Sequence, residues 1–137
     1  MKLQIIALTA AFGLVLSSSP AIMMANSTFD RTLSTGSSPN VTVNSGSGYI
    51  HIHAGSDSQV HIVGHVRANS GWFSADADSR VQQIIANPPI EQNGNDIIVG
   101  QPHNPELYRN INIDYDVTVP RASALSSSTG SGSITIK

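Results

Sequence analysis

Four histidines fall at alternating positions in two neighbouring strand-like stretches: His51, His53, His61 and His65. Imidazole nitrogens bind Zn, Cu and Ni, and opposed residues on paired strands lie about 4.5–5.5 Å apart at Cβ. A periplasmic metal-binding module with His51, His53 and His61 as ligands is therefore one hypothesis. The alternative is a half-exposed sheet face that favours polar side chains. Because no cysteine and no carboxylate at ligand spacing completes the set, we predict no metal and no other cofactor.

Two carboxylates, Asp114 and Asp116, project from one face of a single strand-like run. Two residues of extended chain span about 6.5–7 Å, which overlaps the separation of paired carboxylates in glycosidases. A carbohydrate-active hydrolase is therefore a second alternative. An alternating strand with two solvated aspartates explains the same pattern, and the sequence indicates no cleft around them. We therefore predict no catalytic residues and a non-enzymatic protein.

One aromatic pair, Trp72-Phe73, follows the strand breaker Asn69-Ser70-Gly71. We expect it to pack under a short helix. The alternative is a platform that stacks on a sugar or binds a partner, so Trp72 and Phe73 are weak candidates for binding.

The elements that would position these side chains are organised around a pattern that occurs twice. Ser45-Gly46-Ser47-Gly48-Tyr49-Ile50-His51-Ile52 returns as Thr129-Gly130-Ser131-Gly132-Ser133-Ile134-Thr135-Ile136. Each copy is a small-residue turn followed by an alternating strand. Because a strand and not a helix follows the glycines, they are turn formers and not a phosphate-binding loop.

A hairpin is predicted from 49–54 and 59–68, across the turn 55–58. Directly opposed residues share a face of the sheet. The apolar sets match if Ile52 faces Val60 and Ile50 faces Ile62, a register that places His51 opposite His61. Further strands are predicted at 29–33 and 41–43.

The second half of the chain predicts a helix, a hairpin and one long strand. Asp76 and Asp78 are N-cap candidates for a short helix at about 79–86, whose apolar stripe is Val81, Ile84 and Ile85. Asn93-Gly94 predicts a hairpin turn between 90–92 and 95–99. The run 110–119 alternates strictly, with one buried and one wet face.

The first 25 residues have the order of a secretory signal peptide: Met1-Lys2, an apolar run from Leu3 to Leu16, then small residues up to Ala21 or Ala25, the two candidate cleavage points. The apolar run is shorter than the roughly 20 residues that span a bilayer. We therefore predict a signal peptide at 1–25 and a β-strand repeat domain at 26–137. The expected location is secreted, periplasmic or in the cell envelope.

Charge and composition limit the classes of partner that this chain could bind. The chain has seven Lys and Arg and nine Asp and Glu, and loss of Lys2 leaves six against nine. This acidic balance argues against nucleic acid and anionic membrane surfaces. We expect no membrane span after signal cleavage and an unidentified envelope, surface or glycan partner. Charged residues are 12% of the chain and cysteine is absent, so strands and turns without disulfides are expected.

Five motifs occur in an order that resembles a known family. They are Gly46-Ser47-Gly48-Tyr49-Ile50-His51-Ile52, Gln59-Val60-His61-Ile62-Val63-Gly64-His65-Val66, Val81-Gln82-Gln83-Ile84 with Pro88-Pro89-Ile90, Ile113-Asp114-Tyr115 with Val119-Pro120, and Thr129-Gly130-Ser131-Gly132-Ser133-Ile134. Together they resemble the bacterial adhesin family of β-strand repeat proteins, the DUF4097 family. The resemblance implies an envelope or secreted protein with a stacked, partly β-helical sheet, and no catalytic residues.

The expected fold is mainly β, with stacked strands in a partial β-helix or in sandwich-like sheets and one short helix. The last strand, 134–137, stops inside its own pattern. This predicts either a truncated family member or a short member whose last strand is exposed. An unpaired strand promotes pairing with another chain, so self-association through this C-terminal edge strand is expected.

Overall fold

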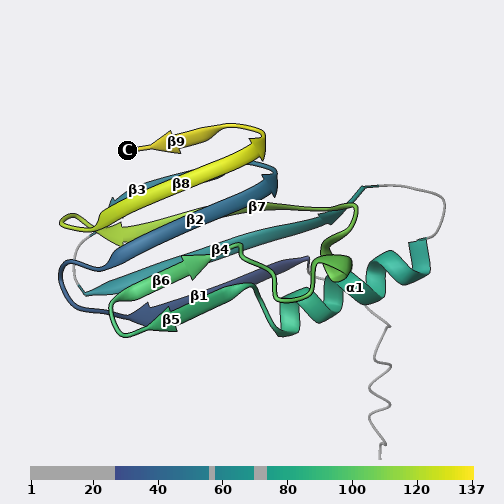
Figure 1. Ribbon diagram of the computed structural model, residues 1–137, viewed down its shortest axis with the longest axis horizontal. Helices are drawn as coiled ribbons and strands as arrows, with labels where there is room; N and C mark the ends of the chain where they lie inside the picture. Colours follow the sequence, from purple (N-terminus) through teal and green to yellow (C-terminus); the bar gives the residue numbers. More distant parts are fainter. Residues whose placement is uncertain (1–26, 56–57, 70–73) are drawn as a thin grey trace, which may run out of the picture.

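The computed structural model of this chain describes residues 27–55, 58–69 and 74–137. The predicted signal peptide, 1–25, and Trp72 and Phe73 lie outside these residues. The described part contains nine strands in two sheets, one α-helix and one 3-10 helix (Figure 1). The prediction of a mainly β fold with one helix is confirmed.

The elements follow one another along the chain with short connections. They are β1 (Thr28–Ser34), β2 (Asn40–Ser47), β3 (Ile50–Gly55), β4 (Gln59–Ala68), α1 (Ser74–Ala86), β5 (Ile90–Asn93), β6 (Asp96–Val99), η1 (Pro105–Tyr108), β7 (Ile111–Pro120), β8 (Ala124–Ser131) and β9 (Ile134–Ile136).

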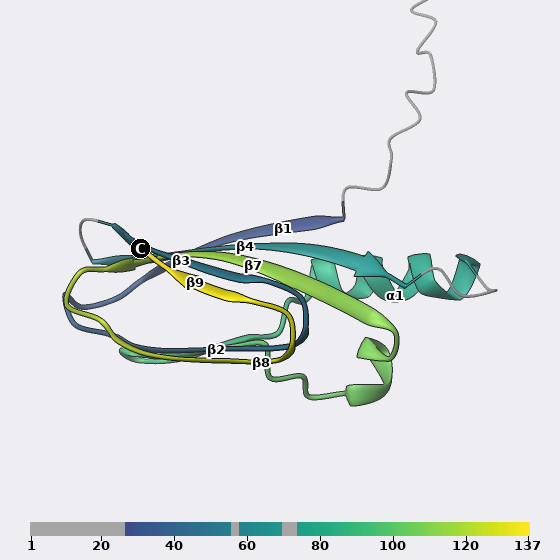
Figure 2. The same ribbon diagram turned by 90° about the horizontal axis from the view of Figure 1, so that it is seen from above.

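Two sheets form two layers. The five-stranded sheet has the order β1-β4-β7-β3-β9, and the four-stranded sheet has the order β5-β6-β2-β8. Figure 2 shows β2 and β8 lying below β3, β7 and β9 in the second layer. Apolar side chains at every second strand position fill the space between the layers. The fully buried strand residues are Phe29, Val41, Val43, Ile50, Ile52, Val60, Ile62, Val66, Ile97, Val99 and Val117, and Ile84 of α1 joins the same core.

The two copies of the Gly-Ser-Gly pattern form stacked rungs, each rung being two consecutive strands with one in each sheet. The middle rung is β2–β3 and the last rung is β8–β9. β8 pairs parallel with β2, and β9 pairs parallel with β3, with Ser45 opposite Thr129 and Ile50 opposite Ile134. The register therefore places equivalent residues of the two copies against each other.

Glycine makes the corner of both rungs. Gly48 has φ 140° and Gly132 has φ 143°, values that residues with a Cβ rarely adopt. A Cβ at Gly132 would lie 2.0 Å from the carbonyl oxygen of Gly48. Gly132 is therefore required for two reasons: its backbone conformation, and the close stacking of its corner on the corner at Gly48.

A further rung lies on the other side of the middle one. β6 pairs parallel with β2, and β7 pairs parallel with β3. The corner between β6 and β7 is expanded to residues 100–110, which include η1. The order of rungs in space is therefore β6–β7, β2–β3, β8–β9, whereas the middle rung comes first in the chain.

The predicted hairpin between the stretches now seen as β3 and β4 is wrong. β7 lies between them, parallel to β3 and antiparallel to β4. His51 therefore faces Asp116 and not His61, and Ile50 faces Tyr115 and not Ile62. The physical reason is that alternation determines which face each side chain occupies but not the neighbouring strand. β7 pairs with eight residues of β4 as well as with all six of β3, so β4 gains a longer match than β3 could offer it.

The helix is longer than predicted. α1 begins at Ser74 and not near residue 79, so Asp76 and Asp78 lie inside it and are not its N-caps. Asp76 lies in the first turn, where a carboxylate interacts favourably with the positive end of the helix dipole. Its Oδ2 is 3.3 Å from Nε of Arg80. The predicted apolar stripe is confirmed, because Val81 and Ile84 are buried in the core.

The predictions for 90–99 and 110–119 are confirmed. β5 and β6 form an antiparallel hairpin, with Asn93 paired to Asp96, so the two-residue turn is Gly94-Asn95, one residue later than predicted. In β7 the apolar side chains from Ile113 to Val119 are buried at alternate positions. Its other face carries Asn112, Asp114, Asp116 and Thr118.

Candidate functional site

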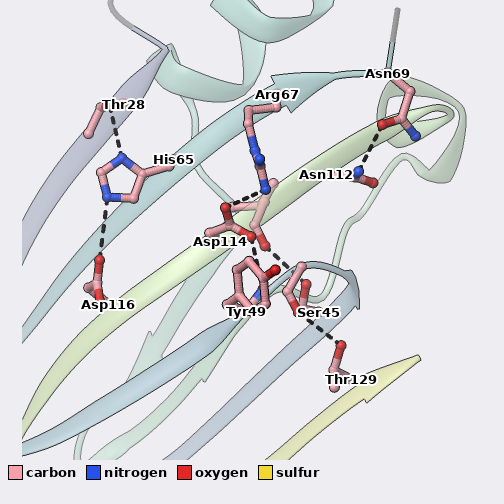
Figure 3. Close-up of polar contacts among 12 residues, drawn as sticks. Thr28, Ser45, Tyr49, His65, Arg67, Asn69, Asn112, Asp114, Asp116 and Thr129 are labelled. Carbon is pink, nitrogen blue, oxygen red and sulfur yellow. Dashed lines mark hydrogen bonds and ion pairs between the residues drawn. The ribbon is translucent and has the colours of Figure 1, made fainter. Parts of the chain in front are cut away.

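The histidines and aspartates that the sequence singles out lie on the outer face of the five-stranded sheet. β1, β4, β7 and β3 each contribute charged or histidine side chains to this histidine–aspartate face, part of which Figure 3 shows. Its members are Asp30, His51, His53, His61, His65, Arg67, Asp114 and Asp116. The sequence predicted a shared face for the histidines but not the aspartates among them, because the strand order was unknown.

Asp116 stands between two histidines that come from different strands. Its Oδ1 is 3.3 Å from Nδ1 of His51 on β3, and its Oδ2 is 3.4 Å from Nε2 of His65 on β4. The other ring nitrogen of His65 lies 3.4 Å from Oγ1 of Thr28 (Figure 3). All of these groups are on the wet side of the sheet, and the Asp116 side chain is 43% exposed.

Asp114 is held more firmly than Asp116. Its Oδ1 accepts a hydrogen bond from the backbone N–H of Tyr49 at 2.8 Å, and its Oδ2 accepts one from Nη2 of Arg67 at 2.5 Å (Figure 3). Its side chain is only 19% exposed. One oxygen therefore holds the backbone next to the corner at Gly48 and the other holds a side chain of β4, so Asp114 has a structural role.

The remaining histidines are apart from this group. His61 faces Thr118 on β7, and its Nε2 lies 2.7 Å from Oδ1 of Asp30 on β1. His53 faces Thr118 from the other side and is exposed. The three predicted ligands, His51, His53 and His61, are therefore divided between two strands that β7 separates.

A metal centre would need these groups to converge. Among residues 27–55, 58–69 and 74–137, no group of three or more histidine, aspartate or glutamate side chains is arranged to hold a metal ion. Three of the four imidazoles instead lie against carboxylates: His51 and His65 against Asp116, and His61 against Asp30. The face is a ladder of cross-strand polar contacts, and exposed contacts of this kind contribute about 0.2–1 kcal/mol each.

The open edge of the last rung is a different kind of surface. β8 and β9 are the outermost strands of their sheets on the same side of the molecule (Figure 1). Ile134 and Ile136 stack on Ile50 and Ile52, yet they remain 38% and 59% exposed. In the described part of the chain, these two side chains are therefore not covered by a further layer, whereas Ile50 and Ile52 of the middle rung are.

Two hollows flank the expanded corner at 100–110. The larger, about 540 Å³, lies between the end of α1, η1 and the start of β5, and its lining includes Pro88, Leu107 and Tyr108. The smaller, about 240 Å³, is lined by Ser45, Tyr108 and Tyr115 among others. Burial raises the pKa of the Tyr115 phenol, and the neighbouring Tyr108 adds to the rise. Neither hollow contains a residue predicted as part of a site.

The fold and these surfaces define a class: a two-sheet, β-solenoid-like stack of three rungs, with one helix and a polar outer face. Comparisons of the chain with models of protein families, with curated proteins and with solved structures found no match. Within the described residues, no helix has the length and apolar character needed to cross a membrane.

Proposed function

We propose that this chain is an exported, non-enzymatic interaction module of the bacterial cell envelope, which binds its partner by strand addition at the β8–β9 edge. The observation that carries the proposal is the exposure of Ile134 and Ile136 on β9, an edge strand of the five-stranded sheet among the described residues. The resemblance of the sequence to the DUF4097 adhesin family and the predicted signal peptide at 1–25 belong to the same proposal.

Backbone geometry supports strand addition. The carbonyl of Ser133 accepts from Ile50 N–H, and Lys137 N–H donates to the carbonyl of Ile52, both at 2.9 Å. Alternate residues of a parallel strand bond to opposite neighbours. The N–H and C=O groups of Ile134 and Ile136 therefore point away from β3, toward the open edge, where an added strand would bond to them.

The composition of the edge supports the proposal further. Natural edge strands are usually protected from pairing by charges, prolines or bulges. No charged residue and no proline stands between Arg121 and Lys137. The edge is therefore chemically suited to accept a strand, with small and apolar side chains that fit close packing.

The alternatives in the chain's polar face have less support. A hydrolase built on Asp114 and Asp116 would need free carboxylates, whereas both oxygens of Asp114 accept structural hydrogen bonds. A metal module built on His51, His53 and His61 would need converging nitrogens, and the three residues lie on strands separated by β7.

The first test measures strand addition directly. A fluorescent peptide with the sequence of residues 122–137, one complete rung, is titrated with the unlabelled chain 26–137, which contains every described element. We expect saturable binding by anisotropy and at least tenfold weaker binding by an Ile136→Pro variant, which lacks one outward N–H. No binding, or equal binding by both proteins, would contradict the proposal.

The second test concerns location and chemistry. The full chain is expressed in an exporting bacterium, and its intact mass is measured in envelope, periplasm and medium. We expect loss of the first 21 or 25 residues and retention on isolated envelopes or on immobilised glycans. An uncleaved cytoplasmic product, or hydrolysis of a glycan that an Asp114→Asn variant no longer performs, would overturn the export or the non-enzymatic part.

A further inference from the structure

We propose that the partner at the β8–β9 edge is a second copy of this chain, joined about a two-fold axis so that β9 pairs with β9 and β8 with β8 of the two copies. This inference rests on the proposed function and names its partner. The described residues offer two ends of the rung stack, and they differ in charge, in strand direction and in shape.

The shape of the last rung determines what can cover it. β8 and β9 belong to different sheets and are joined by the tight corner at Gly132. A partner that covers both layers must therefore present one strand to each sheet, at the spacing of the two layers. A single extended peptide would cover one sheet and leave the other open. A second copy of the same rung has this spacing in both sheets.

The opposite end of the stack is a poorer partner. Its edge strands are β1 and β5. β1 carries Asp30 and Arg31, and β5 carries Glu91, which pairs with His103. These charges are typical of edges that avoid strand pairing. A head-to-tail contact, which would grow into a filament, therefore places these charges against strands β8 and β9, which carry none. A contact between two β8–β9 edges does not.

The side chains at the edge are self-complementary. A two-fold axis perpendicular to the two sheets reverses the strand direction and keeps each layer in place, so β9 pairs antiparallel with its copy and β8 with its own. Ile134 and Ile136 of each copy would then lie against the same residues of the other, on the inner side of the sheet. The layer of core that these residues lack would be supplied by their own counterparts, as expected of an isologous interface.

Proline substitutions separate this edge from the rest of the sheet. Ile136→Pro removes an N–H that faces the open edge and leaves the bonds from Lys137 to β3 in place. Thr32→Pro is the matched control on β1. The carbonyl of Ser27 accepts from Val66 N–H of β4, and Thr35 N–H donates to the carbonyl of Ser58, just before β4. The alternation of an antiparallel pair therefore directs the N–H of Thr32 away from β4, to the open side of β1. Proline is tolerated at such outward-facing edge positions.

The test is sedimentation velocity of the chain 26–137 and of both variants across a hundredfold range of concentration. We expect a dimer of the wild-type chain, at least tenfold weaker dimerisation of Ile136→Pro, and an unchanged dimer of Thr32→Pro. Circular dichroism spectra that match the wild type establish that each variant is folded. If Ile136→Pro fails to fold, Ile136→Lys, which keeps the backbone N–H and charges the edge, is measured in its place.

Four outcomes would overturn the inference: a monomer at every concentration, a dimer that survives both Ile136→Pro and Ile136→Lys, a dimer lost equally in Thr32→Pro, or open-ended polymers. Failure of this inference is distinguishable from failure of the proposed function. A wild-type monomer that still binds the rung peptide of residues 122–137 would leave strand addition standing and remove only the second copy as partner. A monomer that binds no peptide would remove both.

Discussion

Asp114 and Asp116 lie two residues apart on β7, and their surroundings give them different tasks. Asp114 accepts from Tyr49 N–H and from Arg67, and its side chain is largely buried. Asp116 lies in the open between two imidazoles. Hydrogen bonds to charged groups contribute more when they are shielded from water, whereas exposed ion pairs contribute little.

At this scale we predict that Asp114→Ala lowers the free energy of unfolding by about 1.5–3 kcal/mol, because it leaves a backbone N–H and a guanidinium without their acceptor. Urea denaturation followed by circular dichroism measures the loss. The matched change Asp116→Ala removes the same charge from the same strand face and should cost less than about 1 kcal/mol. Equal losses in the two variants would show that Asp114 has no special structural role.

For the four histidines, the sequence predicted the face of the sheet correctly but not the neighbouring side chains. The alternation of 49–54 and 59–68 correctly indicated that His51, His53, His61 and His65 share the wet side of one sheet. It did not indicate their neighbours, because β7 begins 43 residues after β4 ends (from Ala68 to Ile111) and lies between β3 and β4. The His51–Asp116–His65 contact could be found only after the strand order was known.

Among the elements, the rung corner depends most on particular residues. Gly46 and Gly48 stand two residues apart in the same Ser-Gly-Ser-Gly sequence. Gly48 has φ 140°, and a Cβ there would lie 2.4 Å from the carbonyl oxygen of Ile113. At Gly46 a Cβ would meet nothing within 4 Å. The corner therefore requires only one of the two glycines.

The corresponding prediction compares Gly48→Ala with Gly46→Ala. Gly48→Ala should destabilise the fold by about 1–3 kcal/mol from backbone strain alone, with a further loss from the overlap with Ile113. Gly46→Ala should change stability by less than about 1 kcal/mol, since alanine also restricts the unfolded chain. Thermal and urea unfolding of the two variants provide the comparison, which a neutral Gly48→Ala would contradict.

The helix and the second hairpin illustrate how far local signals reach. The apolar stripe of α1 and the Asn-Gly signal both gave correct elements, because helix periodicity and turn chemistry act over a few residues. The predicted start of α1, at about residue 79, was too late. Aspartate is favoured both at the N-cap and in the first turn of a helix, so Asp76 and Asp78 did not fix the start. Boundaries of this kind depend on what the helix packs against.

For the molecule as a whole, the buried phenol of Tyr115 links stability to pH. Burial raises its pKa, so the folded chain holds the proton more tightly than the unfolded chain does. The stability that follows is fully present below the pKa of an unfolded tyrosine, about 10, and is lost as the pH rises above that value. Tyr108, whose pKa burial also raises, adds to the same effect.

We therefore predict that the free energy of unfolding falls by about 1 kcal/mol or more between pH 10 and 11. Urea titrations at pH 8, 10 and 11 measure it. Tyr115→Phe keeps the ring and removes the ionisable group, so its loss over the same interval should be smaller. If the wild-type chain and the variant lose stability in parallel, Tyr115 is not the group responsible.

The sequence by itself determined the local properties of this protein: the mainly β character, the inward and outward faces of the strands, the glycine turns and the existence of a repeated strand unit. These follow from side-chain alternation, turn chemistry and identity between the two copies, all of which act over short stretches or between like segments. Only the tertiary structure decided that β7 separates β3 from β4 and that the β6–β7 rung lies below β2–β3. Such choices depend on which long-range pairing buries the most apolar surface, and no local pattern encodes it.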